Sequence, residues 1–524
     1  MRSTLLAVVI GFSCFCCARK DFFADTPLKD EHALAGTLTY PDSVTVQAGK
    51  HYAHGSLYSF LFGKHYRDVW AAPVQVRVLD IRKEKGGLKI TKVGGSMQST
   101  SLTLRDKQGI EYALRTVDKD PSGSLHPFLK ATFISNFLRD QTSALNPYAA
   151  LIVAPLALAA EIPHAKPELV YVPADSALLG KYTKVAGNRL FMLEEKLEHK
   201  GVLLEDHASV TDVVSTKKLL KKRFSKSRHH VDQLAFAKAR LFDIFINDRD
   251  RHEGQWNWSE HKQDKTTLYK PIPKDRDQAL YKFADGMLPR LIGRGLNYQK
   301  FISFRQDFDD LEALTYKSEY IDQLFLSEVT QEQFDSLAID LKASLTDAVI
   351  EKAVQVLPVS VFSQIGESTT EALKKRRDLL PAAAKTFYTL LAKEVSVVGT
   401  DDAELFRVNR INDELTEVAV LDAESKNVLY QRTFKKEETN VLELFGLGNA
   451  DVFEIKGDVK KGIKIIVYAA SGEDEVIDTS NLKKGPRIVI RRTKAAKGYK
   501  PDAKTKQMLE NTTTSPDFDR KGSN

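Results

Sequence analysis

Alternating apolar and polar positions predict strands in the N-terminal quarter of the chain. Four segments follow this pattern: Val74 to Leu79, Leu88 to Val93, Ser101 to Arg105 and Ile110 to Val117. Alternation is typical of strands that bury one face, and the glycine-containing turns between these segments indicate hairpins. We therefore expect a β-rich lobe over residues 21–128.

Helical spacing of apolar residues follows and dominates to residue 394. It is clearest in three stretches: Leu129 to Leu158, Val231 to Ile246 and Thr330 to Ala392. Pro358 and Pro381 lie in the last stretch, and we expect them to separate successive helices because proline cannot donate a helical hydrogen bond. A short apolar strand, Leu190 to Leu193, interrupts the pattern. Residues 129–394 are thus predicted to form a mostly helical lobe.

Short strands rich in valine and isoleucine return after Glu394, so residues 395–495 predict a small all-β domain. Two segments inside it, Leu444 to Ile455 and Val467 to Asp478, look like spaced copies of a turn, an aspartate and a strand. The second loosely matches a calcium-binding GGxGxD repeat, but two degenerate copies are too few for a calcium roll. Residues 496–524 are polar and without pattern, which predicts a linker or a disordered end.

The first 20 residues have the pattern of an export signal. Arg2 precedes an apolar run from Leu5 to Phe12, which is too short to span a bilayer. All three cysteines of the chain follow directly: Cys14, Cys16 and Cys17. Disulfides therefore cannot stabilise the exported body. A cysteine directly after an apolar run resembles a bacterial lipoprotein signal, in which the cysteine is acylated, and ordinary signal cleavage is the alternative. We expect an exported protein in the periplasm or at the outer membrane, with the lipid anchor left open.

The composition is that of an ordinary globular protein. The chain is 42% hydrophobic and 28% charged, and its net charge of +7 is modest for 524 residues. A nucleic-acid binder concentrates basic charge on a patch, whereas the basic run from Lys217 to His230 is short and typical of a solvated helix face. The charge gives no reason to expect a nucleic-acid partner.

The densest set of candidate catalytic groups lies in the segment Asn247 to His252 (NDRDRH). Asp250 is followed five residues later by Gln255. This is the spacing of the kinase catalytic loop, in which an aspartate orients a hydroxyl and an amide holds a metal ion. Asp250 is therefore the candidate base, and Asp248 is the alternative if the loop register differs. His252 is a further candidate, and its simpler role is a hydrogen bond that braces the loop.

A second acidic pair, Asp275 and Asp277, follows a predicted hairpin. We call the segment Asn247 to Gln255 the catalytic-type loop. The strands Gln255 to Trp258 and Thr267 to Ile272 should bring the acidic pair back beside it. Carboxylates are preferred ligands of Mg²⁺ and Mn²⁺, so we expect one of the two to hold a metal ion that bridges phosphates. A solvated turn with local Lys and Arg partners is the alternative. Zinc is disfavoured because the N-terminal histidines lack compact ligand spacing: His51, His54 and His65.

The N-terminal strands supply candidate phosphate contacts. A glycine turn joins two strands at residues 94–99, and glycine lets backbone N–H groups approach an anionic phosphate. Its candidate binding residues are Gly94, Gly95, Ser96 and Gln98. The next strand along the chain, Glu111 to Val117, carries Arg115 where kinases carry a lysine. Lys119 is the alternative cation if the register differs.

Three acidic residues complete the candidate binding site. The helix after the strands should supply a carboxylate to pair with Arg115, and Asp140 is the candidate. Glu194 and Glu195 follow the apolar strand at the place where a kinase hinge begins, so their backbone is a candidate for binding adenine.

The loop D-R-D-R-H-x-x-Q, followed by P-K-D-R-D-Q, resembles the spore-coat kinases of the CotH group and is similar to HipA kinases and the Golgi casein kinase. The resemblance covers about residues 85 to 290. It implies an α+β fold with a bilobal protein-kinase-like core, ATP with Mg or Mn as cofactors, and a protein or small-molecule hydroxyl as acceptor. The chain departs from that pattern in Arg115 for Lys, in Gln255 for Asn and in lacking D-F-G. The alternative is therefore a non-catalytic pseudokinase-like protein.

A broader resemblance is to an exported region of large bacterial outer-membrane proteins, in which a phosphoesterase domain precedes it and a BamA-like barrel follows. It spans about residues 45 to 495 and is carried by Gly63 to Trp70, by Pro271 to Gln278 and by the Y/F-G-L-G module. It implies an envelope location, an outer-membrane barrel as a partner, and assembly or adhesion as the alternative role.

Overall fold

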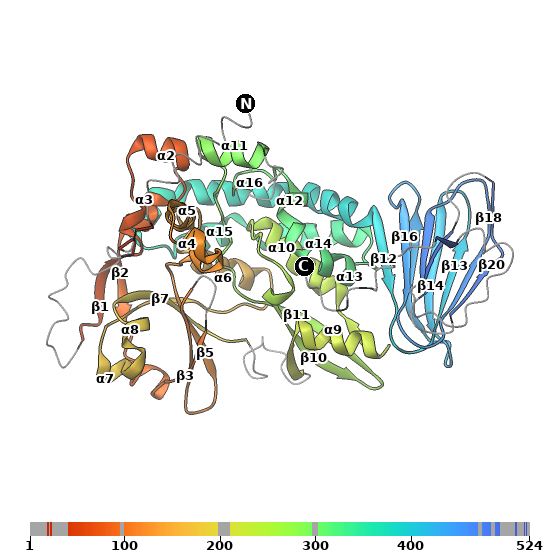
Figure 1. Cartoon of the computed structure of the whole chain (residues 1–524), viewed down its shortest axis with the longest axis horizontal. Coiled ribbons are helices and arrows are strands. Elements are labelled where there is room, and N and C mark those ends of the chain that lie inside the picture. The colour runs from red at the N-terminus through yellow and green to blue at the C-terminus, as the bar shows by residue number, and fades with distance from the viewer. Residues whose placement is uncertain are drawn as a thin grey trace.

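The computed structural model describes residues 40–94, 99–197, 210–295, 302–469, 474–483 and 488–492, with the isolated positions 18–19, 21–23, 509–510, 518 and 520. Three parts follow one another along the chain in Figure 1: a seven-stranded sheet with short helices, a helical body, and a pair of five-stranded sheets. This arrangement confirms the predicted α+β class with a β-rich N-terminal part and an all-β C-terminal part. The export-signal run falls outside the described residues.

The N-terminal sheet has the strand order β1-β2-β6-β7-β5-β4-β3. These strands are β1 (Ser43–Gln47), β2 (Pro73–Val78), β6 (Glu168–Val172), β7 (Arg189–Glu195), β5 (Glu111–Thr116), β4 (Ser101–Arg105) and β3 (Lys89–Gly94). Neighbours are antiparallel except β2 and β6. Two of the strands, β6 and β7, come from the part of the chain that we expected in the helical lobe. The sheet therefore continues to Glu195, because the partner of a strand is set by long-range packing and not by its own pattern.

Short helices cover this sheet and lead into the helical body. The expected helical stretch Leu129 to Leu158 is divided into α4, α5, a 3-10 turn and α6: Pro127–Lys130, Phe133–Asp140, Gln141–Ala144 and Ala149–Ala159. Thr132 caps α5 by accepting the N–H of Ile134, and Pro147 disfavours helix in the residue before it. The segment Phe133–Ala159 contains an 18-residue window that is apolar enough to cross a membrane by composition alone, but 67% of that window is buried inside the fold, as expected of a core segment.

The helical body is centred on α10 and α16, which span Gln233–Phe245 and Val359–Ala392. Our expectation that Pro381 separates two helices is wrong, because α16 is one helix of 34 residues with Pro381 inside it. Leu373, Leu380 and Phe387 are all buried along it, and this packing offsets the roughly 3 kcal/mol that an internal proline costs. The remaining helices are α2 (Ser56–Phe62), α3 (Arg67–Ala71), α7 (Ser176–Leu179), α8 (Thr183–Ala186), α9 (Thr216–Ser225), α11 (Met287–Gly295), α12 (Leu311–Thr315), α13 (Glu319–Phe325), α14 (Gln331–Ser344) and α15 (Asp347–Val354).

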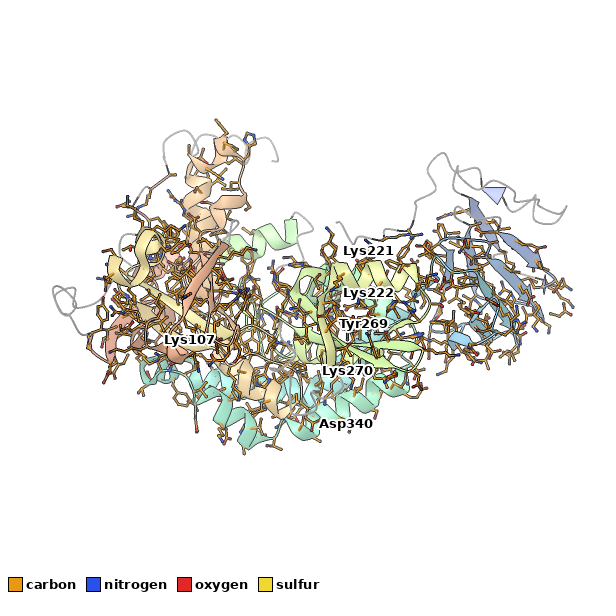
Figure 2. The ribbon with its side chains drawn as sticks, turned by 90° about the horizontal axis from the view of Figure 1, so that it is seen from below. Lys107, Lys221, Lys222, Tyr269, Lys270 and Asp340 are labelled. Carbon is orange, nitrogen blue, oxygen red and sulfur yellow. The ribbon has the colours of Figure 1, made fainter. Side chains whose placement is uncertain are left out.

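A small sheet, β8-β10-β11-β9, packs beside α9 and α10. Its strands in that order are Val210–Ser215, Trp256–Gln263, Thr266–Pro273 and His229–Val231, so the predicted hairpin is confirmed. Figure 2 labels Lys221 and Lys222 of α9, and Tyr269 and Lys270 of β11. Lys222 Nζ pairs with Glu260 at 2.5 Å, so part of the charge of the basic run is neutralised within the fold.

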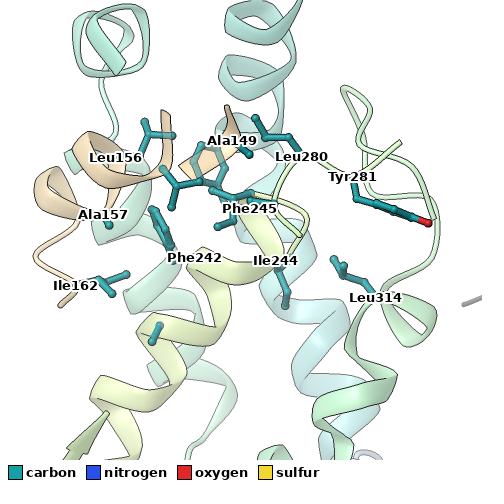
Figure 3. Close-up of a cluster of buried hydrophobic side chains, with 14 of the residues drawn as sticks. Ala149, Leu156, Ala157, Ile162, Phe242, Ile244, Phe245, Leu280, Tyr281 and Leu314 are labelled. Carbon is teal, nitrogen blue, oxygen red and sulfur yellow. The ribbon is translucent and has the colours of Figure 1, made fainter. Parts of the chain in front are cut away.

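The main core lies where α6 meets α10. Figure 3 shows Phe242 and Phe245 of α10 among Leu156 and Ala157 of α6 and Leu280 from the loop after β11, and all five are fully buried. Burying a large apolar side chain stabilises the fold by about 1.5–3 kcal/mol. This packing fixes the end of α10, and with it the start of the catalytic-type loop.

The C-terminal domain consists of two sheets with the orders β12-β16-β19-β22-β23 and β15-β14-β13-β17-β20. The strands of the first sheet are β12 (Glu394–Val398), β16 (Val441–Gly446), β19 (Lys464–Ala469), β22 (Val489–Arg492) and β23 (Leu509–Glu510). Those of the second are β15 (Val428–Lys435), β14 (Leu415–Asp422), β13 (Glu404–Arg410), β17 (Val452–Lys456) and β20 (Glu475–Asp478). A separate two-stranded sheet pairs β18 with β21, Asp458–Val459 with Asn481–Leu482. The first sequence copy spans β16 and β17, and the second spans β19 and β20. The two copies lie side by side, because β16 pairs in parallel with β19 and β17 with β20.

Carboxylates at the turns join neighbouring parallel strands. Asp451 accepts the N–H of Glu404 at 2.9 Å, and Asp474 accepts the N–H of Asp451 at 3.0 Å. The aspartate of each copy thus bonds to the backbone near the beginning of the neighbouring parallel strand. Residues 470–473, in the loose GGxGxD match, fall outside the described residues.

Two of the described positions near the C-terminus contact the fold, and the linker or disordered end expected for residues 496–524 stays a prediction. The Phe518 ring lies 5.1 Å from the Phe445 ring, and Arg520 pairs with Asp401 at 2.8 Å.

Arg376 of α16 joins the helical body to the end of α10. It is buried and donates to the carbonyl of Ile244 at 2.7 Å, of Phe245 at 2.8 Å and of Asp307 at 2.6 Å. A guanidinium at a helix C-terminus satisfies carbonyls that have no partner within the helix and interacts favourably with the helix dipole.

We predict that Arg376→Leu lowers the free energy of unfolding by about 3 kcal/mol, because it leaves buried carbonyls without donors. Urea denaturation measures the loss. The matched control is Lys375→Leu on the same helix, whose side chain is 53% exposed and should change stability by less than about 0.5 kcal/mol. Equal losses in the two variants would contradict the role assigned to Arg376.

Candidate active site between the sheet and the helical body

A cavity of about 440 Å³ lies between the N-terminal sheet, α6 and the loop that follows β11. This volume is within the range of about 300–1,000 Å³ typical of small-molecule sites. Its lining includes six residues that the sequence predicted, from segments far apart in the chain: Gly94, Arg115, Glu194, Glu195, Gln255 and Asp275. An adjoining cavity shares Arg115, Glu194 and Asp275 and adds Lys119 and Asp277. The fold therefore gathers most of the predicted site at one place.

Arg115 stands at the centre of this site. It lies on β5, the third strand of the antiparallel unit β3-β4-β5, so the guanidinium points into the cavity beside the loop after β11. Its Nη1 is 2.8 Å from Asp275 Oδ1, and its Nη2 is 3.4 Å from Glu194 Oε1. Burial opposes ionisation of Asp275, but the charges of Arg115 and Lys119 outweigh it and hold the pKa of Asp275 below its ordinary value.

Lys119 forms a second ion pair in the same site, with Asp277. Burial disfavours its ammonium, yet Asp277 and Asp275 raise the pKa of Lys119. Burial and the negative charge of Asp275 raise the pKa of Asp277, with Lys119 opposing. For Glu194, burial raises the pKa and Arg115 opposes it. Two cations and three carboxylates thus share one largely buried space.

Asp140 does not pair with Arg115 as we expected. Its two oxygens accept Arg67 Nη1 at 2.6 Å and Nη2 at 2.7 Å, and His54 Nε2 lies 3.3 Å away. Arg67 comes from α3, and the pair is almost fully buried, with side-chain exposures of 2% and 3%. Asp140 therefore joins α5 to α3 behind the sheet, while Glu194 of β7 and Asp275 take the place beside Arg115.

The catalytic-type loop begins where α10 ends. Asn247 has a positive φ of 57°, a conformation that asparagine tolerates better than most residues. Asp250 points out of the loop with 21% of its side chain exposed, and its Oδ1 accepts Lys317 Nζ at 2.5 Å. His252 Nδ1 accepts the N–H of Gly254 at 3.1 Å, which is the loop-bracing contact. Gln255 lines the cavity beside Asp275.

Arg251 ties this loop to the segment that carries the acidic pair. Its Nη1 donates to the carbonyls of Lys274 at 2.6 Å and Asp275 at 3.3 Å, and its Nη2 donates to the carbonyl of Gln255 at 3.1 Å. The hairpin β10–β11 alone would bring the two segments near each other. Arg251 then fixes their spacing through three hydrogen bonds.

Asp243, in the last turn of α10, holds three guanidinium groups in the interior. Its carboxylate oxygens lie 2.9 Å from Arg240 Nη1, 3.2 Å from Arg251 Nε and 2.8 Å from Arg276 Nη1, and its side chain is 0% exposed. Burial alone would raise its pKa, but Arg251, Arg276 and Arg240 keep it below the ordinary value. Arg276 lies between the two candidate metal ligands in sequence, so this carboxylate positions both loops.

Asp248 is enclosed beneath the loop and is therefore a poor alternative to Asp250 as a base. It is 1% exposed, and its Oδ1 accepts the N–H of Asp250 at 3.2 Å. Burial raises the pKa of Asp248 to about 7. A group that bonds to its own loop and is closed to solvent cannot reach an incoming hydroxyl.

Some predicted residues fall elsewhere or outside the described part of the chain. Gly95, Ser96 and Gln98, in the covering loop, lie outside the described residues. The three N-terminal histidines each face a different carboxylate: His51 faces Asp118, His54 faces Asp140 and His65 faces Asp285. Among the described residues, no group of three or more His, Cys, Asp or Glu side chains is placed to hold a metal ion by itself.

Sequence reasoning missed Lys317 and Asp243. Lys317 lies 67 residues after Asp250 with no motif to connect them. Asp243 lies on the buried face of α10, among apolar residues. A charged residue at such a position needs a buried partner, and this signal could have identified it from the sequence.

No protein-family model matches the chain, and no curated protein matches it. Solved structures similar to it include the Helicobacter pylori proinflammatory kinase CtkA, which is 10% identical, with 55% of this chain and 93% of that chain covered and a TM-score of 0.29. Another is HipA from a Shewanella oneidensis toxin–antitoxin complex with HipB and operator DNA, at 11% identity, 57% and 67% coverage and a TM-score of 0.28. The Rio2 kinase of Chaetomium thermophilum, in an ADP/Mg²⁺-phosphoaspartate complex, is 13% identical with 57% and 73% coverage and a TM-score of 0.23. Likenesses at this level establish neither a family nor an activity.

The shifted pKa of Asp248 predicts a specific dependence of stability on pH. Its pKa rises from 3.8 to about 7 on folding, so the folded state holds a proton that the unfolded chain releases in this window. This contribution to the free energy of unfolding therefore falls as the pH rises from about 4 to about 7. Asp248→Asn should remove that fall and stabilise the protein by about 2 kcal/mol at pH 8.

Urea denaturation at pH 5 and pH 8 measures this effect, because the gain from Asp248→Asn should be larger at pH 8. The control is Asp264→Asn at the exposed tip of the β10–β11 hairpin, which should follow the natural protein at both pH values. A gain that is the same at both pH values would argue against a raised pKa of Asp248.

Proposed function

We propose that the protein is an exported, envelope-associated kinase-like phosphotransferase that binds ATP with Mg²⁺ or Mn²⁺. The observation that carries this proposal is the convergence of six predicted residues around one cavity, with contributions from β3, β5, β7, the catalytic-type loop and the segment after β11. A phosphoryl-transfer site needs a cation for the phosphates, a carboxylate for metal and a carboxylate to orient the acceptor. Arg115 and Asp275 line this cavity, and Asp250 precedes the lining residues Gly254 and Gln255 on the catalytic-type loop.

Asp275 and Asp277 are the residues that would hold the metal ion. They fit such an ion because the negative charge of Asp275 helps to raise the pKa of Asp277, a like-charge repulsion that a divalent cation relieves. Two carboxylates leave further positions for phosphate oxygens, water and the amide of Gln255. When bound, the metal would neutralise charge on the transferring phosphate.

Asp250 is the proposed base. The acceptor hydroxyl would form a bond to the terminal phosphorus of ATP while the bond to the leaving ADP oxygen breaks. The hydroxyl proton would pass to the Asp250 carboxylate. The Lys317 ammonium lies 2.5 Å from that carboxylate. The acceptor is a protein or small-molecule hydroxyl, and Arg115 would hold the phosphates in place.

A non-catalytic, pseudokinase-like role in outer-membrane assembly or adhesion is the second candidate. One feature favours it: three acidic groups of the site already face a cation of the chain, in the pairs Arg115–Asp275, Lys119–Asp277 and Lys317–Asp250. A cleft neutralised in this way can persist without ligand. The scarcity of ATP outside the cytoplasm favours the same reading.

The sequence supports two further parts of the proposal. An N-terminal lipid anchor on one of the three leader cysteines would hold the protein at the membrane. A separately encoded outer-membrane barrel is the proposed partner, from the resemblance of residues 45–495 to exported barrel-associated regions.

Nucleotide binding is tested by thermal melting with and without ATP and MnCl₂. At 100 times the dissociation constant, ligand should stabilise the folded state by about 2.7 kcal/mol, which raises the melting temperature by a few degrees. The double variant Asp275→Asn, Asp277→Asn should lose this rise, whereas Asp264→Asn should keep it. Absence of any shift in the natural protein would reject nucleotide binding and leave the non-catalytic role.

Catalysis is tested separately with Asp250→Asn. We expect the same melting shift with ATP and manganese as the natural protein, because Asp250 lies outside the cavity lining. Turnover of ATP to ADP should fall by about 10²–10⁴-fold, the usual contribution of a positioned general base. Turnover that is unchanged in Asp250→Asn would exclude this residue as the base.

A further inference from the structure

Two neighbouring helices expose large apolar side chains on one side of the N-terminal part. Leu57 and Phe60 of α2 are 74% and 64% exposed, and Met287 and Leu291 of α11 are 40% and 58% exposed. Figure 1 shows α2 and α11 along the upper edge of the molecule. The helices meet closely, since a side chain on Gly286 would come within 2.2 Å of the backbone nitrogen of Gly63 at the end of α2. We name these four residues the apolar face.

Aromatic residues on the opposite side of α2 pack this helix against α5. Phe62 stacks on Tyr58 at 4.4 Å between ring centroids, and Phe62 also approaches Phe137 of α5 at 6.0 Å. α2 is therefore held to α5 by its aromatic residues, yet none of its seven residues is buried. A helix with the sequence SLYSFLF that is packed on one side and uncovered on the other marks an interaction surface.

The described residues Ala18 and Arg19 contact α5 and the residue that follows α4. The N–H of Ala18 donates to the carbonyl of Ala131 at 3.0 Å, and the N–H of Arg19 donates to Asn136 on α5 at 2.8 Å. Phe22 is buried, so this segment is part of the packed body. Cys17 directly precedes Ala18 in the sequence, and the apolar run Leu5 to Phe12 ends a few residues earlier.

The short connection constrains where a membrane can lie. An extended chain spans at most about 3.5 Å per residue, so an acyl group on Cys14 could stand only about 14 Å from Ala18, and one on Cys17 about 4 Å. A membrane held so close must contact the surface around α4, α5 and α2. Phe128 of α4, which is 74% exposed, is three residues before Ala131 at this exit point.

The charges around the apolar face suit an anionic surface. Lys64, Lys130 and Arg290 are exposed on the same group of helices or directly after them. Basic residues next to exposed leucine and phenylalanine are typical of segments that lie in the interface of a bilayer, with the apolar side chains in the headgroup region and the cations at the phosphates.

We propose that the apolar face docks on an anionic lipid bilayer. The proposal rests on the N-terminal membrane tether but is independent of phosphotransfer, so the two can fail separately. The longest axis of the molecule is horizontal in Figure 1 and both helices lie along its upper edge, so docking would hold that axis along the membrane. The hairpin β4–β5 would point away from the lipid.

The test is hydrogen exchange of the full-length chain, alone and with vesicles of phosphatidylcholine and phosphatidylglycerol at a 3:1 ratio. Backbone amides of α2 and α11 should exchange about tenfold more slowly with vesicles, because lipid contact suppresses local opening. The double variant Leu57→Glu, Phe60→Glu should lose this protection while still floating with vesicles through its N-terminal segment.

The matched control is Ile339→Glu, Val428→Glu, which places the same charges at apolar positions of similar exposure, 59% and 57%, on α14 and β15. It should keep the protection of α2 and α11. Unchanged exchange in the natural chain with vesicles would overturn the proposal. Protection that instead rises with protein concentration in the absence of lipid would assign the face to a second copy of the chain and would also overturn it.

Discussion

The architecture of the site depends on one buried carboxylate. Asp243 lies in the last turn of α10 with no exposure, and three guanidinium groups contact it within 3.2 Å. An unpaired charge in the interior costs several kcal/mol, so removing the carboxylate would leave three buried cations to be accommodated. Arg240 is held in turn by Asp322 of α13 at 2.7 Å. The network thus spans α10, α13, the catalytic-type loop and the segment of the acidic pair, and these elements must fold together.

The charged groups of the cavity pair with one another without any ligand. Arg115 contacts Asp275 and Lys119 contacts Asp277 directly, and these are the groups proposed to bind a nucleotide phosphate and a metal ion. Phosphate would compete with Asp275 for Arg115, and a divalent cation would compete with Lys119 for Asp277. Binding would therefore exchange one set of ion pairs for another. The affinity for a nucleotide and a metal ion would then depend on a difference between two strong sets of interactions.

Membrane docking and phosphotransfer would use different elements of the fold. The apolar face belongs to α2 and α11, whereas the cavity lies between the sheet, α6 and the segment after β11. α5 lies between them, since it contacts α2 through Phe137 and carries Asp140, the partner of Arg67. The buried pair Arg67–Asp140 makes this connection rigid, because a bidentate guanidinium–carboxylate contact fixes both position and orientation.

The sequence by itself determined the local elements and the chemistry that they carry. Period-two alternation gave β2, β4 and β5, and the hairpin length placed Asp275 back beside Gln255, because covalent spacing limits where a short hairpin can end. Arg115 could be placed on the third strand for the same reason. Only the tertiary structure decided which charges meet: Asp140 with Arg67, Lys317 with Asp250, and Asp243 with three arginines. It also decided that β6 and β7 complete the N-terminal sheet and that α16 continues through Pro381. These outcomes depend on contacts between distant residues, and local periodicity carries no information about the partner across a core.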